Sequence, residues 1–175
     1  MKKTSILSIR LYEDEKTSLN TESQIKNITV NSLGRQIISK HVNWYRFTDD
    51  MHYIMITKSS LQILFEKADD IAINNMTSNM HNKLKKTAVF IYGENNIKNI
   101  LSVIDMWLDA CSIPFRHITD FHIEKYVINH NIGKNFSEYL YRLINSALVD
   151  VGHIIKNQTI DESCITFEIE RVSEK

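Results

Sequence analysis

A short segment near the start of the chain alternates apolar and polar residues, and this limits what the segment can fold into. An extended strand of residues 5–11 would place Leu7, Ile9 and Leu11 on one face and the intervening residues on the other. A strand this short is unstable alone in water, because its unpaired backbone groups and its apolar face both need a partner. The sequence therefore predicts that residues 5–11 pair with another strand.

Two helix patterns follow this segment. The acidic run at residues 13–15 favours a helix start, because negative side chains stabilise the positive end of a helix. Thr29 is a good N-cap for a second helix, whose apolar residues recur at helical spacing: Leu33, Ile37, Ile38 and Val42. The start of that helix leaves free backbone N–H groups, which can hold a phosphate.

This order of strand, acidic helix start and second helix opening at residues 28–32 resembles the ribbon-helix-helix family of DNA-binding proteins, the Arc and MetJ type. The resemblance covers roughly the first quarter of the chain. In that family, two copies of the strand pair antiparallel and enter the major groove of DNA. The resemblance therefore implies a double-stranded DNA ligand and a homodimer.

The resemblance also implies roles for individual residues. The groove-facing side chains would be Ile6, Ser8 and Arg10, and the Arg10 guanidinium could contact guanine O6 and N7 together. The helix start capped by Thr29 would clamp a phosphate through its backbone, with these residues contributing: Val30, Asn31 and Ser32. The terminal Lys2 and Lys3 are expected to contact phosphates without reading the base sequence.

Charge is distributed unevenly along the chain, although its formal net charge is zero. Residues 1–48 contain eight Lys or Arg and four Asp or Glu, a net charge of +4, so the remaining 127 residues carry −4. A dimer would bring the positive charge of two such segments to one end, where it could neutralise DNA phosphates.

Residues 51–175 are expected to form a separate α+β domain with a mostly antiparallel sheet, joined to the arm at residues 1–46 by a short linker. Gly93 is expected to end one helix and Asn95 to cap the next. The expected elements are, in order, a strand at 51–57, a helix after Ser59, helices at 71–92 and 97–108, a strand near 126–128, a helix from Phe136 to Ile155 and a strand at 164–170.

The motifs of common enzyme and metal sites are missing from the sequence. It contains no nucleotide-binding loop, nucleophile elbow, paired-cysteine zinc motif or His-Glu-x-x-His motif. No apolar run is long enough to cross a membrane, and Cys111 and Cys164 are expected to be buried thiols in a reducing cytosol. We expect a cytoplasmic protein that is not an enzyme and holds no cofactor.

Histidines offer two further candidates for a binding site. His117 and His122 are five residues apart, which would put them on opposite faces of one strand, so metal binding is the less favoured interpretation. The polar turn at His130, which ends in Gly133 before a helix, could offer backbone donors to an anion. A plain connection between a strand and a helix explains the same turn.

The sequence favours a homodimeric transcription regulator with a ribbon-helix-helix arm. Its C-terminal domain would reinforce the dimer, sense a small-molecule effector or bind a protein partner. One alternative is an antitoxin whose arm regulates its own operon. Another is a small-molecule-binding or enzymatic α/β domain that does not bind DNA.

Overall fold

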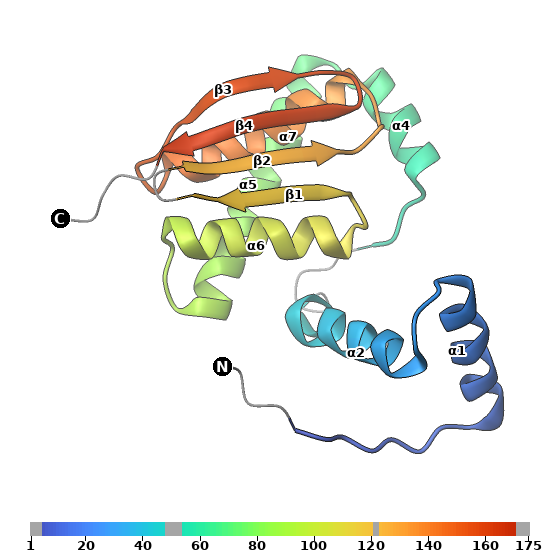
Figure 1. Ribbon diagram of the computed structural model, residues 1–175. Coiled ribbons are helices and arrows are strands. Elements are labelled where there is room, and N and C mark those ends of the chain that lie inside the picture. The colour runs from blue at the N-terminus through green and yellow to red at the C-terminus, as the bar shows by residue number, and fades with distance from the viewer. Residues whose placement is uncertain (1–4, 48–53, 121–122, 171–175) are drawn as a thin grey trace. The chain divides into compact units, whose positions relative to one another are not determined.

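The computed structural model describes residues 5–47, 54–120 and 123–170 of the chain (Figure 1). The chain divides into two compact units, Met1–Arg46 and Phe47–Lys175. We call the first unit the arm and the second the C-terminal domain.

The arm contains two α-helices and a short π-helix that continues the second of them. Their bounds are α1 (Glu13–Ile25), α2 (Val30–Lys40) and η1 (His41–Tyr45). The carboxylate of Glu15 accepts a hydrogen bond from the Tyr12 backbone N–H at 2.8 Å, which fixes the start of α1. Thr29 caps α2 as the sequence predicts, because its Oγ1 accepts from the Ser32 N–H at 3.1 Å.

The strand predicted at residues 5–11 is absent from the single chain. Residues 5–12 have no regular secondary structure and run as an elongated stretch before α1 (Figure 1). Ile6 is 97% exposed and Leu7 is 71% exposed. The predicted strand has the same strand of a second chain as its partner, so a single chain leaves this prediction open. A strand exists only where its backbone pairs with a neighbour, and residues 5–46 of one chain provide none.

The C-terminal domain combines four helices with a four-stranded sheet over the described residues, which confirms the α+β class. All strand pairs are antiparallel, in the order β1-β2-β4-β3. The elements are α4 (Lys58–Lys67), α5 (Asp70–Tyr92), α6 (Ile97–Ala110), β1 (Phe115–Thr119), β2 (Ile123–Asn129), α7 (Lys134–Val149), β3 (Ile155–Ile160) and β4 (Cys164–Glu170).

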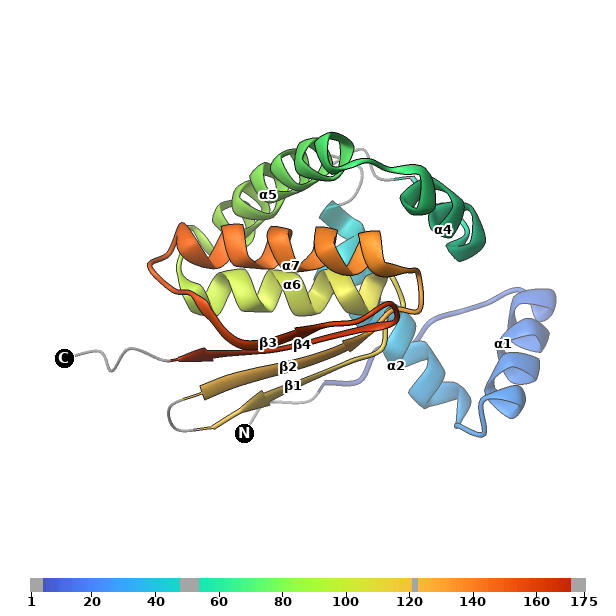
Figure 2. The same ribbon diagram turned by 90° about the horizontal axis from the view of Figure 1, so that it is seen from above.

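The core of the C-terminal domain lies between one face of the sheet and its helices. Helices α6 and α7 cover this face, and α5 packs on them from the other side (Figure 2). Ile128 and Phe167 from the sheet and Leu140 from α7 are at most 1% exposed. The opposite sheet face is exposed, as is usual for an antiparallel sheet that faces water. It carries an ion pair of 3.0 Å between Lys125 and Glu168 and also two exposed apolar side chains, Ile118 and Ile123.

The helices predicted at 71–92 and 97–108 are confirmed, and Gly93 ends the first of them with φ of 83°. The cap of α6 is Asn96 and not Asn95, because the Asn96 side chain accepts from the Asn99 N–H at 2.9 Å. The strand signals near 126–128 and at 164–170 are also confirmed, as β2 and β4.

Three further predictions for the C-terminal domain are wrong. Residues 54–57 form no strand but lead into α4, which Thr57 caps in place of Ser59, while residues 51–53 lie outside the described residues. The last helix ends at Val149, and Ile155 opens β3. The interior of β3 is polar and exposed, so this edge strand has no alternating pattern to reveal it.

Candidate nucleic-acid interface

The start of α2 is the part of the arm best suited to hold an anion. Thr29 Oγ1 accepts from the Ser32 N–H, and the Thr29 hydroxyl donates to Ser32 Oγ at 2.9 Å. Helix geometry leaves the N–H groups of Val30 and Asn31 without an intrahelical acceptor. These two donors and the positive end of the helix dipole lie together at the arm surface.

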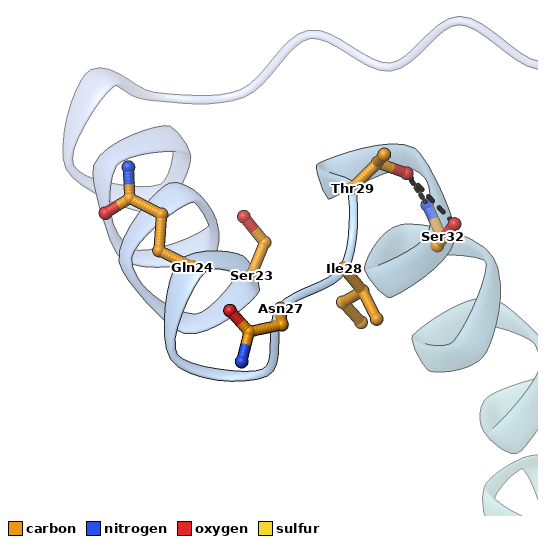
Figure 3. A pocket seen from close by; sticks show the side chains of 6 residues that line it. All are labelled: Ser23, Gln24, Asn27, Ile28, Thr29 and Ser32. Carbon is orange, nitrogen blue, oxygen red and sulfur yellow. Dashed lines mark hydrogen bonds between the residues drawn. The ribbon is translucent and has the colours of Figure 1, made fainter.

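An open hollow of about 720 Å³ lies beside this helix start (Figure 3). The chain turns there between α1 and α2, with Asn27 at φ of 52° and the Ile28 N–H donating to the Ser23 carbonyl at 3.0 Å. Hydroxyl and amide groups line most of the hollow, and no carboxylate does; the lining residues are Ser23, Gln24, Asn27, Ile28, Thr29 and Ser32. Neutral donors around a helix start suit a phosphate oxygen.

The structure groups some of the predicted site residues and not others. Thr29 and Ser32 line the hollow together with Ser23, Gln24 and Asn27 of the α1–α2 turn, which the sequence analysis did not name. Only the tolerance of asparagine for positive φ could have indicated the role of Asn27. Three other predicted site residues are all exposed on the unpaired stretch before α1: Ile6, Ser8 and Arg10. Lys2 and Lys3 lie outside the described residues.

Most apolar side chains of the arm are in contact with water. Leu33 and Trp44 are the buried apolar residues among residues 5–46, at 1% and 5% exposure. The exposed large apolar residues are Ile6, Leu7, Ile9, Leu11, Tyr12, Ile25, Ile37, Ile38, Val42 and Tyr45. An apolar surface of this extent on so small a unit is typical of an interaction site.

The C-terminal domain contains a histidine held between two carboxylates. His117 Nδ1 lies 2.7 Å from Asp105 Oδ2, and His117 Nε2 lies 3.0 Å from Glu124 Oε2. Tyr126 donates to the other Asp105 oxygen at 2.7 Å. Burial lowers the pKa of His117, but the hydrogen bonds and charges of Asp105 and Glu124 outweigh it, so the pKa is raised.

This cluster joins α6 to the β1–β2 hairpin and does not resemble a metal site. The two carboxylates approach different nitrogens of the ring, so the three side chains do not converge on one point. No group of three or more metal-ligating side chains is found anywhere in the parts of the chain that the structure describes.

His130 belongs to a structural connection. Its Nδ1 accepts from the Ile132 N–H at 3.1 Å, so Nε2 carries the proton and donates to Ser137 Oγ at 2.8 Å. The Ser137 hydroxyl donates onward to the Asp161 carbonyl. Burial, helped by the charge of Lys58, lowers the pKa of His130 to about 4. A protonated Nε2 cannot accept the serine proton, so His130 and Ser137 do not form a catalytic pair.

The same connection leaves few backbone donors for an anion. The N–H groups of His130 and Asn131 both donate to the Ser163 carbonyl, and the Gly133 N–H donates to the Glu162 carbonyl. These bonds tie the β2–α7 turn to the β3–β4 turn. The geometry therefore favours the plain connection over the anion site at this turn.

Neither cysteine is buried, although burial was expected for both. Cys111 is exposed at the end of α6, where the chain turns, and Cys164 is half-buried on β4; both are free thiols.

Over the described ranges, no helix has both the length and the apolar character needed to cross a membrane. Comparison with protein-family models, curated proteins and solved structures finds no match to the chain.

Proposed function

We propose that the chain is a homodimeric, sequence-specific DNA-binding regulator of transcription. In this proposal, residues 5–11 of two chains pair into an antiparallel β-ribbon that enters the major groove. The start of α2 in each arm then contacts a phosphate on either side of the ribbon.

The observation that carries the proposal is the exposed, unpaired stretch before α1. Its residues alternate in polarity as a strand does, yet one chain supplies no strand for it to pair with among residues 5–46. Pairing with a second copy would satisfy its backbone and bury Leu7, Ile9 and Leu11 against the apolar side chains of α1 and α2. The other face would then present Ile6, Ser8 and Arg10 to the groove.

The charge and the helix start support DNA as the ligand. Residues 1–48 of each chain carry a net charge of +4, and a dimer would bring the charges of both arms together. The N–H groups of Val30 and Asn31 and the neutral hollow beside them suit a phosphate. Most of the phosphate affinity would be electrostatic and would fall as salt concentration rises.

The C-terminal domain weighs against the antitoxin alternative. An antitoxin tail that wraps a toxin is often short and poorly ordered, whereas this domain has a sheet, two helices that cover one face of it and its own buried core. No described feature specifically favours a small-molecule or enzymatic site over DNA binding.

The proposal is tested by the mass of the chain in solution and by selection from a pool of random DNA duplexes. We expect a dimer by light scattering, enrichment of one duplex sequence, and an affinity for it that decreases with salt. Deleting residues 1–44 should abolish binding to the selected duplex. A monomer, or a truncated chain that binds the duplex as well as the full chain, would contradict the proposal.

A further inference from the structure

The sheet of the C-terminal domain has two edge strands, β1 and β3, and their edges differ. β3 is irregular, because its pairing with β4 shifts between Lys156 and Thr159 and Asn157 has a φ of 50°. Such a bulge protects an edge strand from pairing with another strand. β1 is regular over Phe115–Thr119, and no other described strand pairs with it on its outer side (Figure 1). β1 is therefore the edge that is open to a further strand.

The open edge of β1 presents the backbone groups of alternate residues. The Asp120 N–H donates to the Ile123 carbonyl at 2.9 Å, and the Asn129 N–H donates to the Pro114 carbonyl at 2.8 Å. Even-numbered residues of β1 therefore point their backbone groups toward β2. The odd-numbered residues point theirs away from β2, toward the open edge: Phe115, His117 and Thr119. A second strand could bond to these residues.

The side chains of the even-numbered residues lie on the exposed sheet face. Arg116 is exposed, Ile118 is 52% exposed, and Asp120, which follows β1 in the same alternation, is exposed as well. A positive, an apolar and a negative side chain thus lie in line along this edge. The line is self-complementary in an antiparallel pair, because a half-turn about Ile118 exchanges the positions of Arg116 and Asp120.

We propose that β1 pairs antiparallel with β1 of a second copy of the chain, about a two-fold axis at Ile118. Each Arg116 then lies opposite Asp120 of the other chain, and the two Ile118 side chains meet on the axis. His117 and Thr119 of opposite chains form the hydrogen-bonded pairs. An axis at Arg116 would set two guanidinium groups against each other, and an axis at His117 would place Arg116 opposite Ile118. The charges therefore favour the axis at Ile118.

The length of β1 indicates that the second copy is held nearby. β1 has five residues, whereas a standard stable interface uses roughly 20–30 residues a side. Two freely diffusing chains would therefore associate only weakly through this edge. Chains paired through their arms keep the two C-terminal domains at an effective concentration on the order of millimolar. The β1 contact thus rests on the proposed arm dimer, and it joins the two sheets into one.

The first test places one new thiol in the full-length chain, with Cys111 and Cys164 replaced by serine. Ile118→Cys puts the two thiols of a dimer on the axis. The Cα atoms of such a non-hydrogen-bonded pair lie about 4.5 Å apart, which a disulfide can span. Ile154→Cys is the control, because Ile154 is similarly exposed, at 60%, and precedes β3 at the opposite edge of the sheet.

We expect Ile118→Cys to form an interchain disulfide at least about tenfold faster than Ile154→Cys, because its two thiols are held together. The oxidant is air with a copper–phenanthroline catalyst. The rate should not change on dilution while light scattering shows a dimer. Both variants should keep the thermal midpoint of the parent, because both side chains are exposed.

The second test exchanges the two charges in the Ile118→Cys chain. Arg116→Asp sets two carboxylates against each other on each side of the axis and should slow the disulfide about tenfold. Adding Asp120→Arg to Arg116→Asp restores opposite charges across the axis and should restore the rate. Damage to the hairpin by the first substitution would not be repaired by the second.

Equal disulfide rates for Ile118→Cys and Ile154→Cys, or a rate for Ile118→Cys that falls on dilution, would overturn the β1 contact. A strand of a different protein on this edge would keep the two thiols apart and give the same result. A rate that Arg116→Asp leaves unchanged, or that the double exchange does not restore, would overturn the pairing of Arg116 with Asp120.

Light scattering on the same samples separates the β1 contact from the arm dimer. A dimer in which Ile118→Cys does not form the disulfide faster contradicts only the β1 contact. A monomer contradicts the arm dimer and the β1 contact together.

Discussion

Ser32→Glu places a negative charge at the start of α2, where the proposed complex has a DNA phosphate. Ser32 is exposed, and its side chain takes part in one hydrogen bond, accepting from the Thr29 hydroxyl at 2.9 Å. Losing that exposed bond costs little, and a carboxylate near a helix N-terminus contributes about 0.3–1 kcal/mol. We therefore expect the stability of the arm to change by less than about 1 kcal/mol.

The effect on DNA binding should be much larger. A glutamate about 4 Å from a phosphate is repelled by about 1 kcal/mol at the dielectric constant of water and by more in a partly buried interface. Two arms double this to at least about 2 kcal/mol, or roughly a thirtyfold loss of affinity. The assay is fluorescence anisotropy with the selected duplex at 0.1 M salt, together with light scattering and thermal melting of the free protein.

Ser39→Glu is the matched control. It makes the same change on the same helix, seven residues further along, or about 10 Å from Ser32. Since the Debye length at 0.1 M salt is about 10 Å, repulsion from that position is largely screened. Unchanged DNA affinity in a folded Ser32→Glu dimer, or equal losses in both variants, would refute the contact between the α2 start and a phosphate.

Further predictions concern base reading, pH dependence and the connection at His130. Arg10→Ala should reduce discrimination between the selected duplex and its mutants by about 1–3 kcal/mol; equal losses for every duplex would assign Arg10 to phosphate contact. Lys2→Ala should weaken binding to all duplexes and reduce the salt slope by about 2, that is, about 1 for each chain of the dimer. The pKa of His117 is raised in the folded state, so protonated His117 stabilises the fold. This stabilisation is fully present below the pKa of the unfolded chain, about 6.5, and is lost as pH rises through the pKa of the folded protein. Urea titrations should therefore show this part of the unfolding free energy disappearing as pH rises, and His117→Gln should remove that pH dependence; an unchanged pH profile in the variant would contradict the assignment. Ser137→Ala should lower the unfolding free energy by about 1–3 kcal/mol in the same assay, because it leaves the His130 Nε2–H buried without its acceptor, and a neutral substitution would show that the bond contributes nothing.

Part of the fold follows directly from local patterns in the sequence. The apolar spacing of residues 97–108 predicts α6, and the alternation of residues 164–170 predicts β4, because each element buries one face against the same core. Residues 54–57 were predicted to form a strand and do not, because an apolar run can also lead into a helix and remain exposed. The polar edge strand β3 lacked any pattern to detect.

The candidate interface was predictable only in part. Thr29 could be recognised as an N-cap because capping depends on residues close in sequence. Ser23, Gln24 and Asn27 reach the same hollow only because the chain turns between α1 and α2 at a positive φ of Asn27. A sequence pattern does not give the direction of such a turn.

The sequence by itself determined the spans of α5 and α6, the glycine that ends α5 and the two best strands, because these depend on contacts within a few residues. Only the tertiary structure decided that His117 lies between Asp105 and Glu124 and that Ile63 faces water while Phe65 is buried. These outcomes depend on contacts between residues that are distant in sequence. Which of two apolar side chains on one helix is covered is set by the neighbouring element, and periodicity alone does not identify that neighbour.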